Sequence, residues 1–139
     1  MSLISLNGGC LCGAVRYEAG GEPVRFYHCH CSRCRKASGT GHASNIMLVP
    51  GTVKWLQGED LLGRYKVPEA ERFETCFCQR CGSPLPRELP ELEMAVIPAG
   101  SLDNEPPLDP QARIFWDSRT DWSCPAGDLP VFAQYPPQT

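Results

Sequence analysis

Seven of the nine cysteines in this chain lie in three short motifs, Cys10-x-Cys12, Cys29-x-Cys31-x-x-Cys34 and Cys78-x-x-Cys81. Cysteines two residues apart on a strand share one face, with Cα atoms about 6.6 to 6.8 Å apart, so both thiolates can bind one metal ion. A structural zinc site uses four protein ligands, whereas a catalytic zinc site uses three and keeps one position open. The motifs supply two, three and two thiolates, which predicts one closed and one open zinc site.

The closed site should combine the first and last motifs, because each of them lacks two ligands. A structural zinc would then bind Cys10, Cys12, Cys78 and Cys81. Such a site joins the N-terminal turn to the middle of the chain and contributes on the order of 10 kcal/mol to folding. Gly82 follows directly and permits a tight turn that points backbone amides at the sulfurs. We assign no catalysis to this site.

The open site would consist of Cys29, Cys31 and Cys34. His28 and His30 alternate with the first two cysteines, so on a strand these histidines face away from the metal. We expect them to lie in the core or to support the ligands, with metal binding as the alternative.

Three further residues could supply a fourth ligand, but each has a simpler interpretation. His42 is expected to be a turn residue, Cys76 a buried free thiol, and Cys124 part of a turn rich in proline and glycine. Ligation remains the alternative for each of them.

Three cations crowd the open site, namely Arg33, Arg35 and Lys36. A zinc ion with three thiolates carries a net charge of about −1, so nearby cations would offset it. The same cations could bind the carboxylates of a substrate. The alternative is an ordinary solvated turn.

Composition limits the class of protein. A chain of 139 residues is expected to form a single domain over residues 1–139, and 14 prolines and 13 glycines favour a loop-rich, mainly β protein. The net charge of −3 opposes nucleic-acid binding. No apolar run is long enough to span a membrane and no secretory signal is recognised, so we expect a cytoplasmic protein. Cysteines there serve metal or redox chemistry rather than disulfides, which remain the alternative.

Short apolar runs separated by turn residues predict the secondary structure. Strands are expected at residues 3–6, 14–18, 25–30, 61–67, 72–78 and 94–97, and one helical turn at residues 32–37. Residues 42–49 and 53–56 are expected to form a hairpin around Pro50-Gly51. The aromatic residues in 114–116 and 131–135 are expected to cover the core.

Three segments resemble the glutathione-dependent formaldehyde-activating enzyme family, which also includes centromere protein V. They read GCLCGAVRY at residues 9–17, HCHCSRCRK at residues 28–36 and FCQRCGSPL at residues 77–85. The spacing of Trp116, Trp122 and the DLPVF sequence at residues 128–132 is similar to the family's C-terminal part. The resemblance therefore covers nearly the whole chain.

This resemblance implies a mainly β, β-tent zinc fold of antiparallel sheets with short helical turns. It implies two Zn²⁺ per chain, one matching Cys10, Cys12, Cys78 and Cys81 and one matching Cys29, Cys31 and Cys34. It also implies a carbon–sulfur lyase that reversibly joins formaldehyde and glutathione into S-hydroxymethylglutathione. The partners would be a small thiol and an aldehyde.

Three thiolates make zinc a weak Lewis acid, so the open site suits thiolate exchange better than water activation. Two other functions remain open at this point. One is a non-catalytic zinc-binding module for protein interactions, and the other is a redox sensor in which oxidation of Cys29, Cys31 and Cys34 releases zinc. The oligomeric state stays undetermined.

Overall fold

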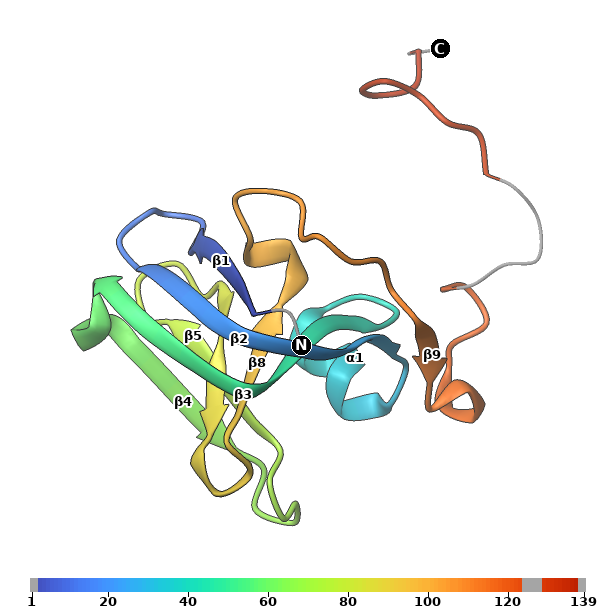
Figure 1. The fold of residues 1–139 in the computed structure, drawn as a ribbon. Coiled ribbons are helices and arrows are strands. Elements are labelled where there is room, and N and C mark those ends of the chain that lie inside the picture. Colours follow the sequence, from blue (N-terminus) through green and yellow to red (C-terminus); the bar gives the residue numbers. More distant parts are fainter. Residues whose placement is uncertain (1–2, 124–128, 138–139) are drawn as a thin grey trace.

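The computed structural model describes residues 3–123 and 129–137. Two sheets organise them (Figure 1). The larger sheet follows the order β1-β2-β3-β8-β7, with β9 also paired to β2, and consists of β1 (Ile4–Gly9), β2 (Arg16–Cys29), β3 (Ala43–Gln57), β7 (Arg87–Leu89), β8 (Met94–Pro98) and β9 (Ala112–Ile114). The smaller sheet consists of β4 (Leu62–Lys66), β5 (Glu74–Cys78) and β6 (Pro84–Leu85). All pairs are antiparallel except β2 with β9. The expectation of a mainly β fold of antiparallel sheets is confirmed.

The helices are short. The α-helix α1 covers Ser32–Ser38, as expected from the sequence. The 3-10 helices are η1 (Glu59–Leu61), η2 (Pro90–Leu92), η3 (Ala99–Ser101) and η4 (Trp116–Ser118). Within residues 3–123 and 129–137, no helix is long and apolar enough to cross a membrane.

The expected hairpin around Pro50-Gly51 is wrong, because β3 continues through these residues as one strand. β2 likewise continues through Gly20-Gly21. The register pairs Gly21 with Gly51, so the two turn-like sequences lie opposite each other and the strands stay paired there. A Cβ atom at Gly21 would lie 2.1 Å from the Pro50 carbonyl oxygen, so glycine permits this close approach. The paired strands continue past these residues, with shifts of register between Gly21 and Arg25.

The hydrophobic core lies between the two sheets, and side chains of β2, β3 and β8 fill much of it. Its completely buried members include Tyr17, Ile46, Leu48 and Ile97. Burying side chains of this size contributes about 1.5 to 3 kcal/mol each. This core fixes the far end of β2, where the second cysteine motif begins.

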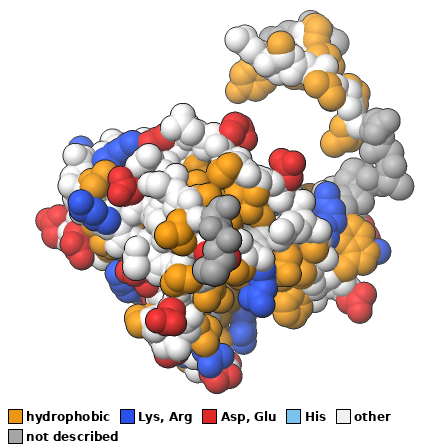
Figure 2. Space-filling view, viewed as in Figure 1, with side chains coloured by type: hydrophobic (Ala, Val, Ile, Leu, Met, Phe, Trp, Pro, Cys, Tyr) orange, Lys and Arg blue, Asp and Glu red, His pale blue; other side chains and the backbone are white. Residues whose placement is uncertain are grey.

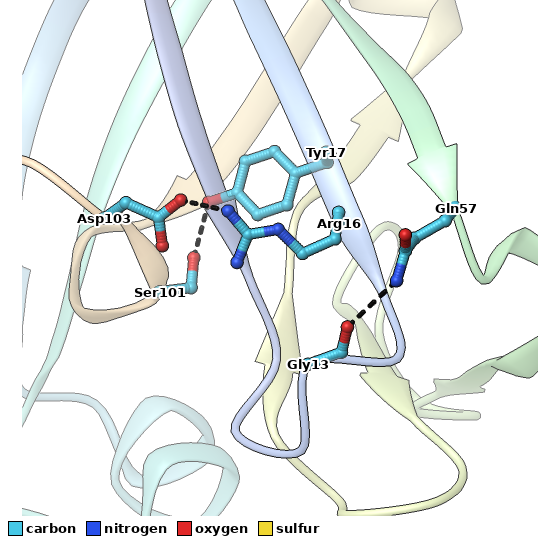
Figure 3. Close-up of polar contacts among 6 residues, drawn as sticks. All are labelled: Gly13, Arg16, Tyr17, Gln57, Ser101 and Asp103. Carbon is cyan, nitrogen blue, oxygen red and sulfur yellow. Dashed lines mark hydrogen bonds and ion pairs between the residues drawn. The ribbon is translucent and has the colours of Figure 1, made fainter.

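A polar network attaches the segment after β8 to the N-terminal strands (Figure 3). Ser101 donates a hydrogen bond to the Pro98 carbonyl oxygen, so the hydroxyl of Tyr17 donates to Ser101 at 2.6 Å. Burial raises the pKa of Tyr17 to about 12, which keeps this proton in place. Arg16 forms an ion pair with Asp103 beside this bond. The network holds η3 against the sheet next to the first cysteine motif.

Replacing Tyr17 by phenylalanine is expected to lower the free energy of unfolding by about 1 kcal/mol. The ring still packs in the core, but the hydrogen bond to Ser101 is lost. Urea denaturation of the two proteins measures the difference. An unchanged midpoint would show that this bond does not stabilise the fold.

The C-terminal aromatic residues do not cover the core as expected. Val131 and Tyr135 are 93% and 91% exposed, and Phe115 and Phe132 are also exposed. Figure 2 shows hydrophobic side chains along the C-terminal segment of residues 129–137, which projects from the rest of the protein. A pattern of aromatic residues indicates burial only when a sheet face lies beside it, and residues 129–137 form no strand.

Candidate functional site

The sulfurs of Cys10, Cys12, Cys78 and Cys81 converge within 4.8 Å of one another, and we call them the four-cysteine cluster. The first two lie in the loop after β1, and the last two lie at the end of β5 and in the following turn. The Sγ atoms of Cys10 and Cys12 are 3.6 Å apart, and those of Cys12 and Cys78 are 4.0 Å apart. Tetrahedral zinc with bonds of about 2.3 Å places sulfurs about 3.8 Å apart. The cluster therefore fits a zinc ion and would join the two sheets.

Backbone turns around the four-cysteine cluster direct N–H groups at the sulfurs. Gly13 and Gly82 adopt positive φ angles of 81° and 79°, and the N–H groups of Val15 and Arg80 donate to Cys10 and Cys78 at 3.2 and 3.3 Å. Hydrogen bonds of this kind stabilise thiolates. The turn expected at Gly82 is confirmed.

Cys81 is prepared for ionisation. Its Sγ lies 3.2 Å from the Ser83 hydroxyl, and hydrogen bonds from the Ser83 side chain and backbone lower the pKa of Cys81 to about 5. Metal ligands bind as thiolates, so Ser83 favours the metal-binding form of this cysteine.

Cys29, Cys31 and Cys34 form a second group, the three-cysteine cluster, with sulfurs within 4.8 Å of one another. Cys29 ends β2, Cys31 caps the start of α1, and Cys34 lies within α1. The cap is a hydrogen bond from the Cys34 N–H to the Cys31 Sγ at 3.3 Å. The Cys31 sulfur therefore acts as the N-cap of α1, because it accepts a hydrogen bond from one of the free N–H groups in the first turn of the helix. A zinc ion bound here would have three protein ligands and one open position.

The three thiols differ in how readily they ionise. Burial opposes ionisation of Cys31, but hydrogen bonds from the Cys34 backbone and from the other two thiols lower its pKa overall. Burial raises the pKa of Cys34 and of Cys29. A cation is therefore needed to hold all three as thiolates.

The three histidines stack together outside the three-cysteine cluster. Ring centroids lie 4.2 Å apart for His28 and His42, and 5.0 Å apart for His30 and His42. The Ser44 hydroxyl lies 2.9 Å from His28 Nδ1 and 3.2 Å from His42 Nδ1. Burial, followed by neighbouring positive charge, lowers the pKa of all three imidazoles, so they are neutral near pH 7. Among the described residues, no histidine joins either cysteine group.

Cys76 is buried on β5 and belongs to neither cluster, which confirms the expectation of a buried free thiol. The described cysteines form no disulfide with one another. Cys124 lies outside the described residues.

A pocket of about 1070 Å³ adjoins the three-cysteine cluster at Cys34 and also reaches Cys10 of the four-cysteine cluster. Cys34 and His42 line it, and Tyr65, Phe73 and Phe77 provide part of an apolar wall. Its volume suits a ligand of peptide size. Residues from α1, β3, β5, β7 and β8 meet there.

The structure separates the three cations expected near the open site. Arg33 and Lys36 line the pocket, but Arg35 does not. The half-buried Arg87, on β7, lines the same pocket and was not expected from the sequence. The segment around Arg87 carries no metal-binding motif, and only the pairing of β7 with β8 brings it to the site.

A model of the glutathione-dependent formaldehyde-activating enzymes matches residues 5–118. The chain belongs to this family. Both cysteine clusters and the pocket residues lie within the matched range. The family assigned by resemblance is thus confirmed.

A relative in the family comes from Halomonas elongata and is named "Putative glutathione-dependent formaldehyde-activating enzyme". It is 33% identical over 125 residues, which cover 84% of this chain and 78% of the relative. A crystal structure of a Rhodobacter sphaeroides protein is similar in fold, with a TM-score of 0.53 and 23% identity, over 78% of this chain and 99% of that one.

Proposed function

We propose that this protein catalyses the reversible addition of a thiol, glutathione in particular, to formaldehyde, and so acts as a carbon–sulfur lyase. The observation that carries the proposal is the three-cysteine cluster beside a large pocket with cationic lining residues. The relative's printed name supports glutathione and formaldehyde as substrates. The reduced thiols that the account requires suit the cytoplasm.

Each cysteine cluster is proposed to hold one Zn²⁺, structural at the four-cysteine cluster and catalytic at the three-cysteine cluster. A zinc ion with an open position supplies a binding site for the substrate sulfur and lowers the pKa of its thiol. The donor sets support this division, because only the three-cysteine cluster leaves a position for a substrate.

The reaction needs a proton to move from sulfur to oxygen. The thiol S–H bond breaks, a bond forms between sulfur and the formaldehyde carbon, and the carbonyl oxygen gains the proton to become the hydroxyl of a hydroxymethyl thioether. No oxidant or reductant is required. His42 lines the pocket as a neutral imidazole, so it is our candidate for accepting this proton and returning it to oxygen.

Arg33 and Lys36 are proposed to bind the carboxylates of glutathione, because both line the pocket from α1. Converting Arg33 and Lys36 together to glutamine is expected to raise KM for glutathione roughly 3- to 30-fold, since exposed charges contribute up to about 1 kcal/mol each. kcat should change little. Initial rates over a range of glutathione concentrations measure the effect.

Arg35→Gln is the matched control, because Arg35 lies on the same helix but does not line the pocket. A KM increase in the control equal to that of the double variant would contradict a role for the pocket cations.

The proposed activity is tested by following ¹³C-formaldehyde and glutathione by exchange NMR spectroscopy. The protein should accelerate exchange between free formaldehyde and S-hydroxymethylglutathione above the spontaneous rate. A rate that equals the spontaneous one, with zinc bound at both clusters, would refute this function. The protein would then be better explained as a zinc-binding interaction module.

A further inference from the structure

Arg87 carries a charge that the protein itself does not pair. Its guanidinium donates a hydrogen bond to the Glu74 backbone carbonyl oxygen and lies 5.1 Å from the centre of the Phe73 ring. Within residues 3–123 and 129–137, no carboxylate lies within ion-pairing distance of it. Burial lowers the pKa of Arg87, yet an arginine side chain stays charged in proteins.

Glu74 and Cys34 attract this cation electrostatically without forming an ion pair with it. A half-buried cation with no direct anionic partner is costly unless an anion completes its environment. The other arginines and lysines of the pocket wall are exposed and hydrated, whereas Arg87 is half-buried. Its surroundings are also more apolar, because Phe73 covers one face of the guanidinium. An anion would bind more strongly to Arg87 than to Arg33 or Lys36, since less water screens the charge.

Arg87 lies in the pocket beside the three-cysteine cluster, where we propose that the reaction takes place. It lines the same pocket as Cys34. An extended tripeptide spans about 10 Å. Because Cys34 and Arg87 line one pocket of about 1070 Å³, a thiol substrate with its sulfur at the three-cysteine cluster can place a terminal carboxylate near Arg87.

We propose that Arg87 is the specificity-determining residue of this pocket and binds one carboxylate of the thiol substrate through its planar guanidinium. The fork of N–H donors matches a carboxylate, which accepts two parallel hydrogen bonds. The hydrogen bond that the guanidinium donates to the Glu74 carbonyl oxygen, together with the contact with Phe73, holds the guanidinium in position for this. The inference rests on the proposed function, because it assigns the substrate that the three-cysteine cluster would receive.

The test measures binding rather than turnover. S-methylglutathione keeps both carboxylates but has no free thiol, so it cannot bind the metal as a thiolate. Its affinity and that of its diethyl ester are compared by calorimetry for the wild-type protein, Arg87→Met and Arg87→Lys. Methionine keeps an apolar stem against Phe73, and lysine keeps the charge but loses the fork.

The wild-type protein should bind the acid more tightly than the ester. Arg87→Met should lose roughly 10- to 100-fold in affinity for the acid, as expected for a hydrogen bond to a charged group, with little change for the ester. Arg87→Lys should recover part of the difference. Arg64→Met is the control, because Arg64 is an exposed arginine on β4 that does not line the pocket.

Three results would overturn the inference. They are wild-type protein that does not bind S-methylglutathione, equal losses for acid and ester in Arg87→Met, and loss of zinc from Arg87→Met with its preference for the acid unchanged. The last result would mean that Arg87 balances the charge of the three-cysteine cluster. Melting temperatures show whether each variant is folded. The proposed function is tested by a different result. It is wrong if the wild-type protein does not accelerate the exchange between formaldehyde and its glutathione adduct.

Discussion

Replacing Cys78 by serine is expected to leave the chain largely unfolded at 25 °C. Cys78 is completely buried and belongs to the cluster that joins the two sheets. Structural zinc contributes on the order of 10 kcal/mol of folding free energy in small domains, whereas whole domains are stable by about 5 to 15 kcal/mol. Loss of one of four ligands therefore removes much of the total. Circular dichroism and the protection of amide hydrogens from exchange measure the outcome.

Cys76→Ala is the matched control for this prediction. Cys76 lies on the same strand and is 3% exposed, but it belongs to neither cluster. Its replacement should cost only about 1 kcal/mol, typical of a small change in a core. If both variants fold with similar stability, the four-cysteine cluster does not hold the structural metal that we propose.

Replacing Cys31 by serine is expected to abolish the proposed reaction while leaving the fold intact. Cys31 caps α1 through its sulfur, and a serine hydroxyl is an equally good helix cap. The substitution thus removes a thiolate but preserves the helix. The rate should fall by more than the roughly 10- to 100-fold that accompanies loss of a residue that only orients a metal ligand. Exchange NMR spectroscopy of formaldehyde and glutathione measures this rate.

The fold of Cys31→Ser is checked by its melting temperature, which should stay close to the wild-type value because the four-cysteine cluster is unchanged. Wild-type activity in a folded Cys31→Ser protein would place the reaction somewhere other than the three-cysteine cluster. A large fall in melting temperature would instead give this cluster a structural role.

Cysteine spacing predicted both groups of sulfurs that the structure brings together. This succeeded because metal ligands within a motif are local in sequence, and because ligand number allowed only one sensible pairing of the remaining motifs. Their occupancy by zinc stays a prediction. The α-helix at Ser32–Ser38 was also predictable, since glycine follows it and adopts the left-handed conformation at Gly39.

The strand boundaries were less predictable. Pro50-Gly51 reads as a turn when it is considered alone, but in the structure Gly51 lies opposite Gly21 on the neighbouring strand. Only the pairing of two distant segments reveals that both lie within continuous strands. The hydrogen bonds between β2 and β3 therefore outweigh the local preference of these residues for a turn.

The pocket could not be derived from the sequence, because strands far apart in the chain build it. Arg35 lies between two pocket residues in sequence, yet the helical repeat turns it away. Arg87 is 53 positions after Cys34 and reaches the pocket only through the sheet. Sequence proximity thus identified two of the cations that line the pocket and missed the half-buried one.

We propose that the two cysteine clusters hold two zinc ions with different roles. Elemental analysis of protein purified without chelator or added metal tests it most directly. We expect about two zinc ions per chain in the wild-type protein and about one in folded Cys31→Ser. Equal zinc content in these two proteins would contradict it, because the three-cysteine cluster would then bind no zinc that depends on its thiolates.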